Sequence, residues 1–180
     1  KATFFVNGHI GFENTYQRIV NEGHKLGNHT YSHDYGEVYS SIDSFFNSIN
    51  KLNEYLSSLG IGGADIVRFP GGSNNTVSIQ YGGADLMDKL VNQAVINGYD
   101  YFDWNVSSGD ANKVTEDKDV IINNVKKGCA GKRNPVILMH DSAPKTTTAD
   151  GLQEIIDYLK GQGYRFEILE SGNGVPAKFK

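Results

Sequence analysis

The feature that most constrains the fold of this 180-residue chain is the alternation of short apolar segments with longer segments of helical periodicity. The clearest helix is predicted at 41–59, where apolar residues recur at helical spacing and Gly60 follows as a helix-ending residue. Further helices are predicted at 13–22, 84–97, 117–127 and 149–162, and strands at 2–6, 25–29, 65–69, 99–104, 135–140 and 164–169. This alternation favours βα units and a parallel sheet. The predicted strands number six or seven, fewer than the roughly eight of a full barrel. Periodicity alone does not decide between an open sheet and a closed barrel.

Size and composition are those of one globular domain. The hydrophobic fraction is 38%, the charged fraction 21% and the net charge −4. The charge balance gives no basic surface, so we expect no nucleic-acid partner. No apolar run is long enough to predict a membrane span. Cys129 is the only cysteine, which excludes an internal disulfide and a cysteine-cluster zinc site; we interpret it as a small packed residue.

Polar side chains suited to chemistry stand where four of the predicted strands end. They are His29, His33, Arg68, Asp103 and His140. The carboxyl ends of parallel strands meet at one rim, so we expect these groups to gather there. Five ionisable groups arriving from four strands predict a functional site, whereas any one of them alone would not.

Each group also has a simpler explanation. His29 and His33 stand four residues apart, so both imidazoles can reach one metal ion, but surface histidines explain an isolated pair equally well. Arg68 can orient a carboxylate, and Gly71 leaves its backbone N–H open to close approach. A structural ion pair and an ordinary turn are the alternatives for these two, and are favoured when each is taken alone.

The strand at 99–104 carries two carboxylates, Asp100 and Asp103, which alternation places on opposite faces. A carboxylate beside His140 would stabilise its protonated form, as a general acid requires. The alternatives are a helix cap or ion pair for Asp103 and a satisfied core histidine for His140. Leu138 could line an apolar pocket, and Trp104 is either core or pocket wall.

Taken together, these segments resemble the polysaccharide deacetylases, the NodB-homology domain of carbohydrate esterase family 4. The family pattern is H-[ST]-x-x-H, R-x-P-x, D-x-x-D-W and L-x-H. It stands here in the same order at 29–33, 68–71, 100–104 and 138–140. The opening K-A-T-F-F-V is similar to the family's second strand, so the resemblance covers nearly the whole chain and residues 1–180 are expected to be one deacetylase domain.

The resemblance implies metal-dependent chemistry. His29 and His33 would bind a divalent ion, zinc first, with cobalt, nickel or manganese as alternatives. Arg68 would orient the catalytic base. The N–H of Gly71 would stabilise the oxyanion of the tetrahedral intermediate.

The resemblance also implies the acid, the substrate and the fold. Asp103 would pair with His140, which protonates the leaving amine, and Leu138 with Trp104 would enclose the acetyl methyl group. The expected substrate is a polymer of N-acetylglucosamine units, peptidoglycan first, chitin-type oligomers next and acetylated xylan after. The parent protein would then be exported and be extracellular or wall-associated. The expected fold is α/β, a distorted (β/α) barrel of about seven strands with the first strand missing.

One family motif has no counterpart here. The family's T-F-D-D motif lies upstream of the K-A-T-F-F-V strand and supplies the base and the third protein ligand of the metal, so we expect an N-terminally incomplete domain. Such a chain should bind metal weakly and show little activity, and its exposed sheet edge should favour poor solubility or dimerisation. A non-catalytic carbohydrate-binding relative is the second hypothesis. A structural or interaction domain is a third, which needs four ordered motifs by coincidence.

Overall fold

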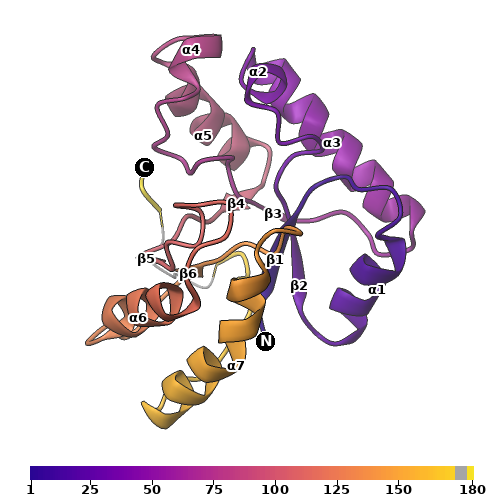
Figure 1. The fold of residues 1–180 in the computed structure, drawn as a ribbon. Coiled ribbons are helices and arrows are strands. Elements are labelled where there is room, and N and C mark those ends of the chain that lie inside the picture. The colour runs from indigo at the N-terminus through magenta and orange to yellow at the C-terminus, as the bar shows by residue number, and fades with distance from the viewer. Residues whose placement is uncertain (173–177) are drawn as a thin grey trace. The chain divides into compact units, whose positions relative to one another are not determined.

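The computed structural model describes residues 1–172 and 178–180, and the chain divides into two compact units (Figure 1). Unit 1 contains Lys1–Asp103 with the described residues of 167–172 and 178–180, and unit 2 contains Trp104–Phe166. Each unit has its own parallel sheet and its own core.

The sheet of unit 1 has four parallel strands in the order β1-β2-β3-β4, which confirms the predicted parallel sheet. The strands are β1 (Thr3–Val6), β2 (Lys25–Asn28), β3 (Ile66–Val67) and β4 (Asp100–Tyr101). In the register, Asn28 pairs with Val67, and Val67 pairs with Tyr101. The residues that follow β2, β3 and β4 therefore lie at one edge of this sheet.

Five helices accompany this sheet: α1 (Glu13–Asn21), α2 (Tyr35–Val38), α3 (Ile42–Ser58), α4 (Ile79–Gly82) and α5 (Leu86–Ile96). The predicted helix at 41–59 is confirmed as α3. Ser41 caps it by accepting a hydrogen bond from the Ser44 N–H, and Gly60 takes a positive φ of 76° just beyond its end.

Helix α3 joins the two apolar clusters of unit 1. Phe45 and Ile49 are fully buried in the cluster that contains Phe69, whereas Leu52 and Leu56 are fully buried in the cluster that contains residues of α1 and β2. Burying one such side chain contributes roughly 1.5–3 kcal/mol. The apolar face of α3 thus fixes the helix against the strands that end at the candidate site.

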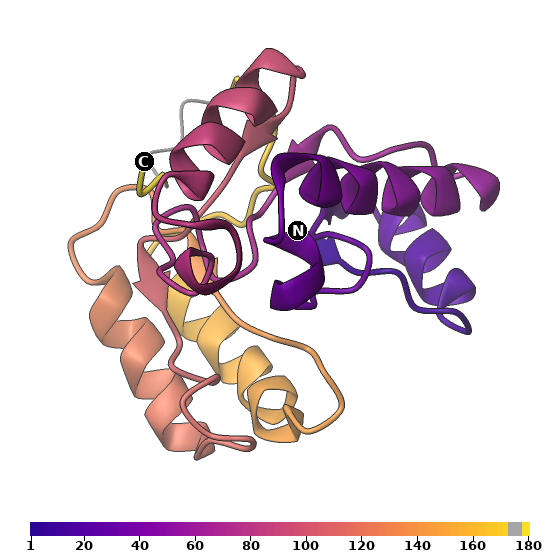
Figure 2. The same cartoon turned by 90° about the horizontal axis from the view of Figure 1, so that it is seen from above.

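Unit 2 pairs β5 (Val106–Ser107) with β6 (Ile137–Leu138) in parallel. Helices α6 (Lys118–Cys129) and α7 (Thr146–Gly161) lie side by side, as Figures 1 and 2 show, over a core that includes Val106, Val125 and Leu159. Cys129 is buried in this core, and burial raises the pKa of its thiol, in agreement with a packing role.

Some predictions are corrected. The strand predicted at 164–169 is wrong, because Tyr164 and Phe166 pack against the core of unit 2 without joining a strand ladder. Strand β5 and the short helices α2 and α4 were not predicted. Over residues 1–172 and 178–180 the strands form sheets of four and two strands, so the α/β class with parallel strands is shown, and the barrel stays a prediction. Within the same residues, no helix combines the length and apolar character needed to cross a membrane.

Candidate functional site

The two histidines of the H-x-x-x-H segment lie together just beyond β2. The ring centroids of His29 and His33 are 4.8 Å apart, with the rings nearly edge to face at 66°. Nδ1 of His29 lies 2.7 Å from the backbone oxygen of Arg68. A carbonyl only accepts, so Nδ1 carries the proton, and Nε2 is the nitrogen with a lone pair for a metal ion.

The loop that carries these histidines is held in a strained shape. In the part of the chain that the structure describes, Thr30 and His33 are the non-glycine residues with positive φ, at 67° and 57°. Buried Thr30 donates its N–H to Oδ1 of Asn28, and its Oγ1 accepts from the His33 N–H. Asn7 donates its side-chain amide to the carbonyls of His29 and Thr30. Strain held in place by such a network is typical of functional loops.

The histidine pair fits two ligands of a metal site. Imidazole nitrogens suit zinc and similar divalent ions. Across the described residues, no three His, Cys, Asp or Glu side chains gather in a way that could hold an ion. His29 and His33 therefore account for two ligands, and metal binding by this chain stays a prediction.

Arg68 is buried at the carboxyl end of β3 and is tied to the end of β4. Its Nε donates to the backbone oxygen of Phe102 and its Nη2 to that of Asp103, each at 2.9 Å. Burial lowers the pKa of Arg68 to about 10, while nearby Asp103 acts in the opposite direction. The guanidinium is therefore charged at neutral pH and fixes two strand ends together; its expected role in orienting a base stays a prediction.

Asp103 anchors the turn that bears Gly71. Its Oδ1 accepts from the Ser73 N–H at 2.8 Å, and its Oδ2 accepts from Oγ of Ser73 at 2.6 Å and from the Phe179 N–H at 2.8 Å. Gly71 is exposed with φ 78°, and a Cβ there would lie 3.2 Å from Cβ of Asn75. The turn thus needs glycine at this position, and Asp103 holds its shape.

In unit 2, His140 pairs with a buried carboxylate. Nδ1 of His140 lies 2.8 Å from Oδ1 of Asp110, and the His140 N–H donates to Oδ2 at 2.7 Å. The Asp110 side chain is 2% exposed and that of His140 40%. Burial acts to raise the pKa of Asp110, but the hydrogen bonds from the ring and N–H of His140 outweigh it and hold the pKa below its usual value.

This pairing sets the tautomer of His140. An ionised carboxylate only accepts hydrogen bonds, so Nδ1 of the ring carries a proton. Nε2 is left as the atom that can gain or lose a proton. A half-exposed imidazole backed by a buried carboxylate suits general acid–base chemistry.

The carboxylate partner of His140 corrects the sequence prediction, which assigned Asp103. The actual partner, Asp110, was missed because the two-residue strand β5 was not recognised. Val106 pairs with Ile137 and Ser107 with Leu138, so the residues after β5 and β6 are neighbours. The sequence signal that could have identified Asp110 is its position, four residues after the apolar Val106 and directly after Ser108 and Gly109.

The remaining predicted residues of unit 2 are Leu138 and Trp104, both half-buried. Leu138 lies in β6, and its backbone oxygen accepts from the Ser108 N–H. Enclosure of an acetyl methyl group by these two side chains stays a prediction.

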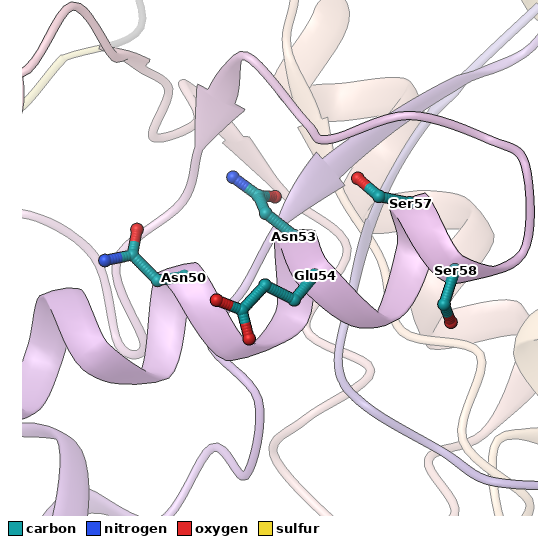
Figure 3. Close-up of a pocket in the computed structure, with 5 residues that line it drawn as sticks. All are labelled: Asn50, Asn53, Glu54, Ser57 and Ser58. Atoms are coloured by element: carbon teal, nitrogen blue, oxygen red, sulfur yellow. The ribbon is translucent and has the colours of Figure 1, made fainter.

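The surface of α3 carries a shallow depression, shown in Figure 3. It is lined by Asn50, Asn53, Glu54, Ser57 and Ser58. The amide of Asn53 is engaged within the fold, since it bonds to Asn28 and to the backbone of Ala64. None of the predicted site residues lines this depression, so it adds no chemistry to them.

Comparison with known sequences identifies relatives over nearly the whole chain. The family profile described as polysaccharide deacetylase matches residues 1–84. The chain is 34% identical over 178 residues to a peptidoglycan-N-acetylglucosamine deacetylase of Bacillus cereus, covering 95% of this chain and 58% of the relative. A second enzyme of the same name from that organism is 31% identical and is covered to 63%. The chain thus spans about three-fifths of the length of these curated relatives.

Solved structures give the same likeness in three dimensions. The catalytic domain of a peptidoglycan N-acetylglucosamine deacetylase from Eubacterium rectale matches with a TM-score of 0.91 at 34% identity, over 98% of this chain and 78% of that one. An esterase of carbohydrate esterase family 4 from Streptococcus mutans matches with a TM-score of 0.77 at 28% identity, over 93% of this chain and 74% of that one.

Proposed function

Because the chain belongs to the polysaccharide deacetylase family, we propose that it serves in metal-dependent removal of N-acetyl groups from N-acetylglucosamine units of a polysaccharide. Peptidoglycan is the preferred polymer, with chitin-type oligomers second, because the relatives from B. cereus and E. rectale are named for peptidoglycan. The observation that carries the proposal is the His29–His33 pair, held in a strained loop with the tautomer of His29 fixed.

The metal chemistry is assigned to unit 1. Zinc, with cobalt, nickel or manganese as alternatives, supplies Lewis acidity when bound. His29 offers Nε2 to the ion, because its Nδ1 proton is donated to the Arg68 carbonyl. Gly71 presents a backbone N–H on a turn fixed through Asp103, which suits stabilisation of a developing oxyanion. Arg68 is proposed to orient the base.

The proton chemistry is assigned to His140. Cleaving an amide needs a proton on the leaving nitrogen, because an amine anion is a poor leaving group. Nε2 of His140 donates that proton, while Asp110 keeps Nδ1 protonated and the ring oriented. Leu138 and Trp104 are proposed to bound the space for the acetyl methyl group.

The activity of these 180 residues alone is proposed to be low. Two imidazoles hold an ion less tightly than three ligands, and the described residues offer no group of three. The same observation favours the second candidate function, glycan binding without catalysis. Since wall polymers lie outside the membrane, we propose that the protein works extracellularly or at the wall.

The test compares acetate release from N-acetylglucosamine oligomers, with zinc added, by residues 1–180 and by an engineered version extended before Lys1 with a strand that carries the family's T-F-D-D motif. We expect acetate from the extended version only, and none from its His140→Ala variant. If the extended version binds the oligomer and releases no acetate with any of the four metals, glycan binding without catalysis is the function.

A further inference from the structure

We propose that the start of α7 is the positioning element of the Asp110–His140 pair. Thr148 holds the Asp110 carboxylate, and Lys145 holds the backbone of the loop that carries it. Neither residue was singled out by the sequence. The consequence for catalysis rests on the proposed function, whereas the structural claim does not.

Thr148 adds a donor from α7 to those that His140 supplies to the carboxylate. Its side chain is buried, and Oγ1 donates to Oδ2 of Asp110 at 3.2 Å. The same oxygen accepts from the His140 N–H at 2.7 Å, while Oδ1 faces Nδ1 of the His140 ring. These donors, together with the Ser108 side chain, fix the plane of the carboxylate. The direction of the Nδ1–H bond, and with it the orientation of the imidazole, follows from that plane.

Lys145 acts on the backbone of the same loop. Its ammonium donates to the carbonyls of Asp110 at 2.7 Å, Lys113 at 2.7 Å and Val114 at 3.0 Å. An ammonium has three N–H donors, so these carbonyls use all of them. One ammonium therefore holds the backbone at both ends of the 110–114 loop, including the backbone of Asp110. A planar guanidinium could not converge on three carbonyls in this way.

Both contacts come from the start of one helix. Lys145 is the N-cap residue of α7, and Thr148 lies in the first turn of the helix. Farther along α7, Ile155 and Leu159 are buried in the core of unit 2, which anchors the helix that bears both residues. Lys145 and Thr148 are thus positioning residues, which act on His140 through Asp110.

The structural claim is tested on residues 1–180 by NMR of the His140 Nδ1 proton, whose signal is resolved only when a fixed acceptor slows its exchange with water. Thr148→Val removes the hydroxyl and keeps the shape, Thr148→Ser keeps the donor, and Lys145→Met removes the ammonium. The matched control is Thr147→Val, because Oγ1 of Thr147 donates to the Glu116 carbonyl.

We expect the Nδ1 signal in the parent, Thr148→Ser and Thr147→Val, and its broadening or loss in Thr148→Val and Lys145→Met. Unchanged signals in the last two variants would overturn the inference. If Thr148→Val does not fold, Lys145→Met alone decides by the same readout.

The kinetic arm uses the version extended with the T-F-D-D strand, described under the proposed function. Thr148→Val should lower kcat at least about tenfold with KM unchanged, the lower end of what one hydrogen bond to a charged group is worth, and Thr148→Ser should restore it. No acetate release by any form would refute the proposed function and leave the NMR result standing. An unchanged kcat in an active enzyme would overturn the positioning role alone.

Discussion

Replacing Asp110 by asparagine tests the pair in unit 2 most sharply, because the change keeps the shape and removes the charge. The carboxylate accepts two hydrogen bonds from His140 and one from Thr148, and the Ser108 side chain also stabilises its charged form. An amide offers one oxygen, so its NH2 group must face a donor. If the oxygen keeps the His140 N–H, the NH2 group faces Nδ1 and disfavours a proton there.

The expected cost follows from these bonds. Hydrogen bonds to charged groups are worth about 1.5–3 kcal/mol each and neutral ones about 0.5–1.5 kcal/mol. Losing one bond and weakening two others costs about 2–4 kcal/mol. Asp110 is almost fully buried, and a neutral amide is easier to bury than a carboxylate, which offsets part of the loss. We therefore expect a net destabilisation of unit 2 of about 2 kcal/mol at pH 7.

The assay is urea unfolding followed by circular dichroism, with amide exchange in α6 and α7 to report on unit 2, since the chain has two units. The folded pKa of Asp110 is lowered. Its contribution is therefore complete above the unfolded pKa of about 3.9 and is lost as the pH falls through the lower folded pKa. The difference in unfolding free energy between the parent and Asp110→Asn should be at its full value at pH 7 and should shrink as the pH falls below about 4.

The control is Asp141→Asn, the same change at an exposed residue beside His140. It should alter stability by less than about 0.5 kcal/mol, as surface changes do. If Asp110→Asn behaves like this control at pH 7, the buried carboxylate does not hold His140 in the way described here.

Three further outcomes are expected. His33→Ala should weaken zinc binding at least tenfold by calorimetry, because one of two imidazole ligands is lost; equal affinity would place the metal elsewhere. Ser73→Ala should lower the unfolding free energy by about 1–3 kcal/mol, because Asp103 loses a buried donor, whereas a thermal scan that matches the parent would contradict this anchor. Gly71→Ala should lower the unfolding free energy by about 1–2 kcal/mol, since φ is positive and Asn75 is close. An unfolding free energy in urea equal to that of the parent would show that the turn adapts.

The elements that could be predicted are those whose signals are local. Helix α3 was predicted nearly to its ends, because its apolar spacing and the Gly60 that follows it are local signals. The closeness of His29 and His33 was predicted in the same way, from four-residue spacing after a strand.

The elements that could not be predicted depend on distant partners. Strand β5 has two residues, and only its pairing with β6 defines it, so the carboxylate that follows it was assigned to the wrong position. The strand predicted at 164–169 has the apolar residues of a strand but no partner among the described strands. The positive φ of Thr30 could not be foreseen either, because a β-branched residue disfavours it and only the buried Asn28 network enforces it.

The most direct test of the central claim is a crystal structure grown with added zinc, with anomalous scattering measured at the zinc edge. We expect an anomalous peak about 2.0–2.1 Å from Nε2 of His29 and at the same distance from a ring nitrogen of His33. The contradicting result is a zinc peak elsewhere, with no zinc at either imidazole, at a zinc concentration that supports acetate release by the extended version.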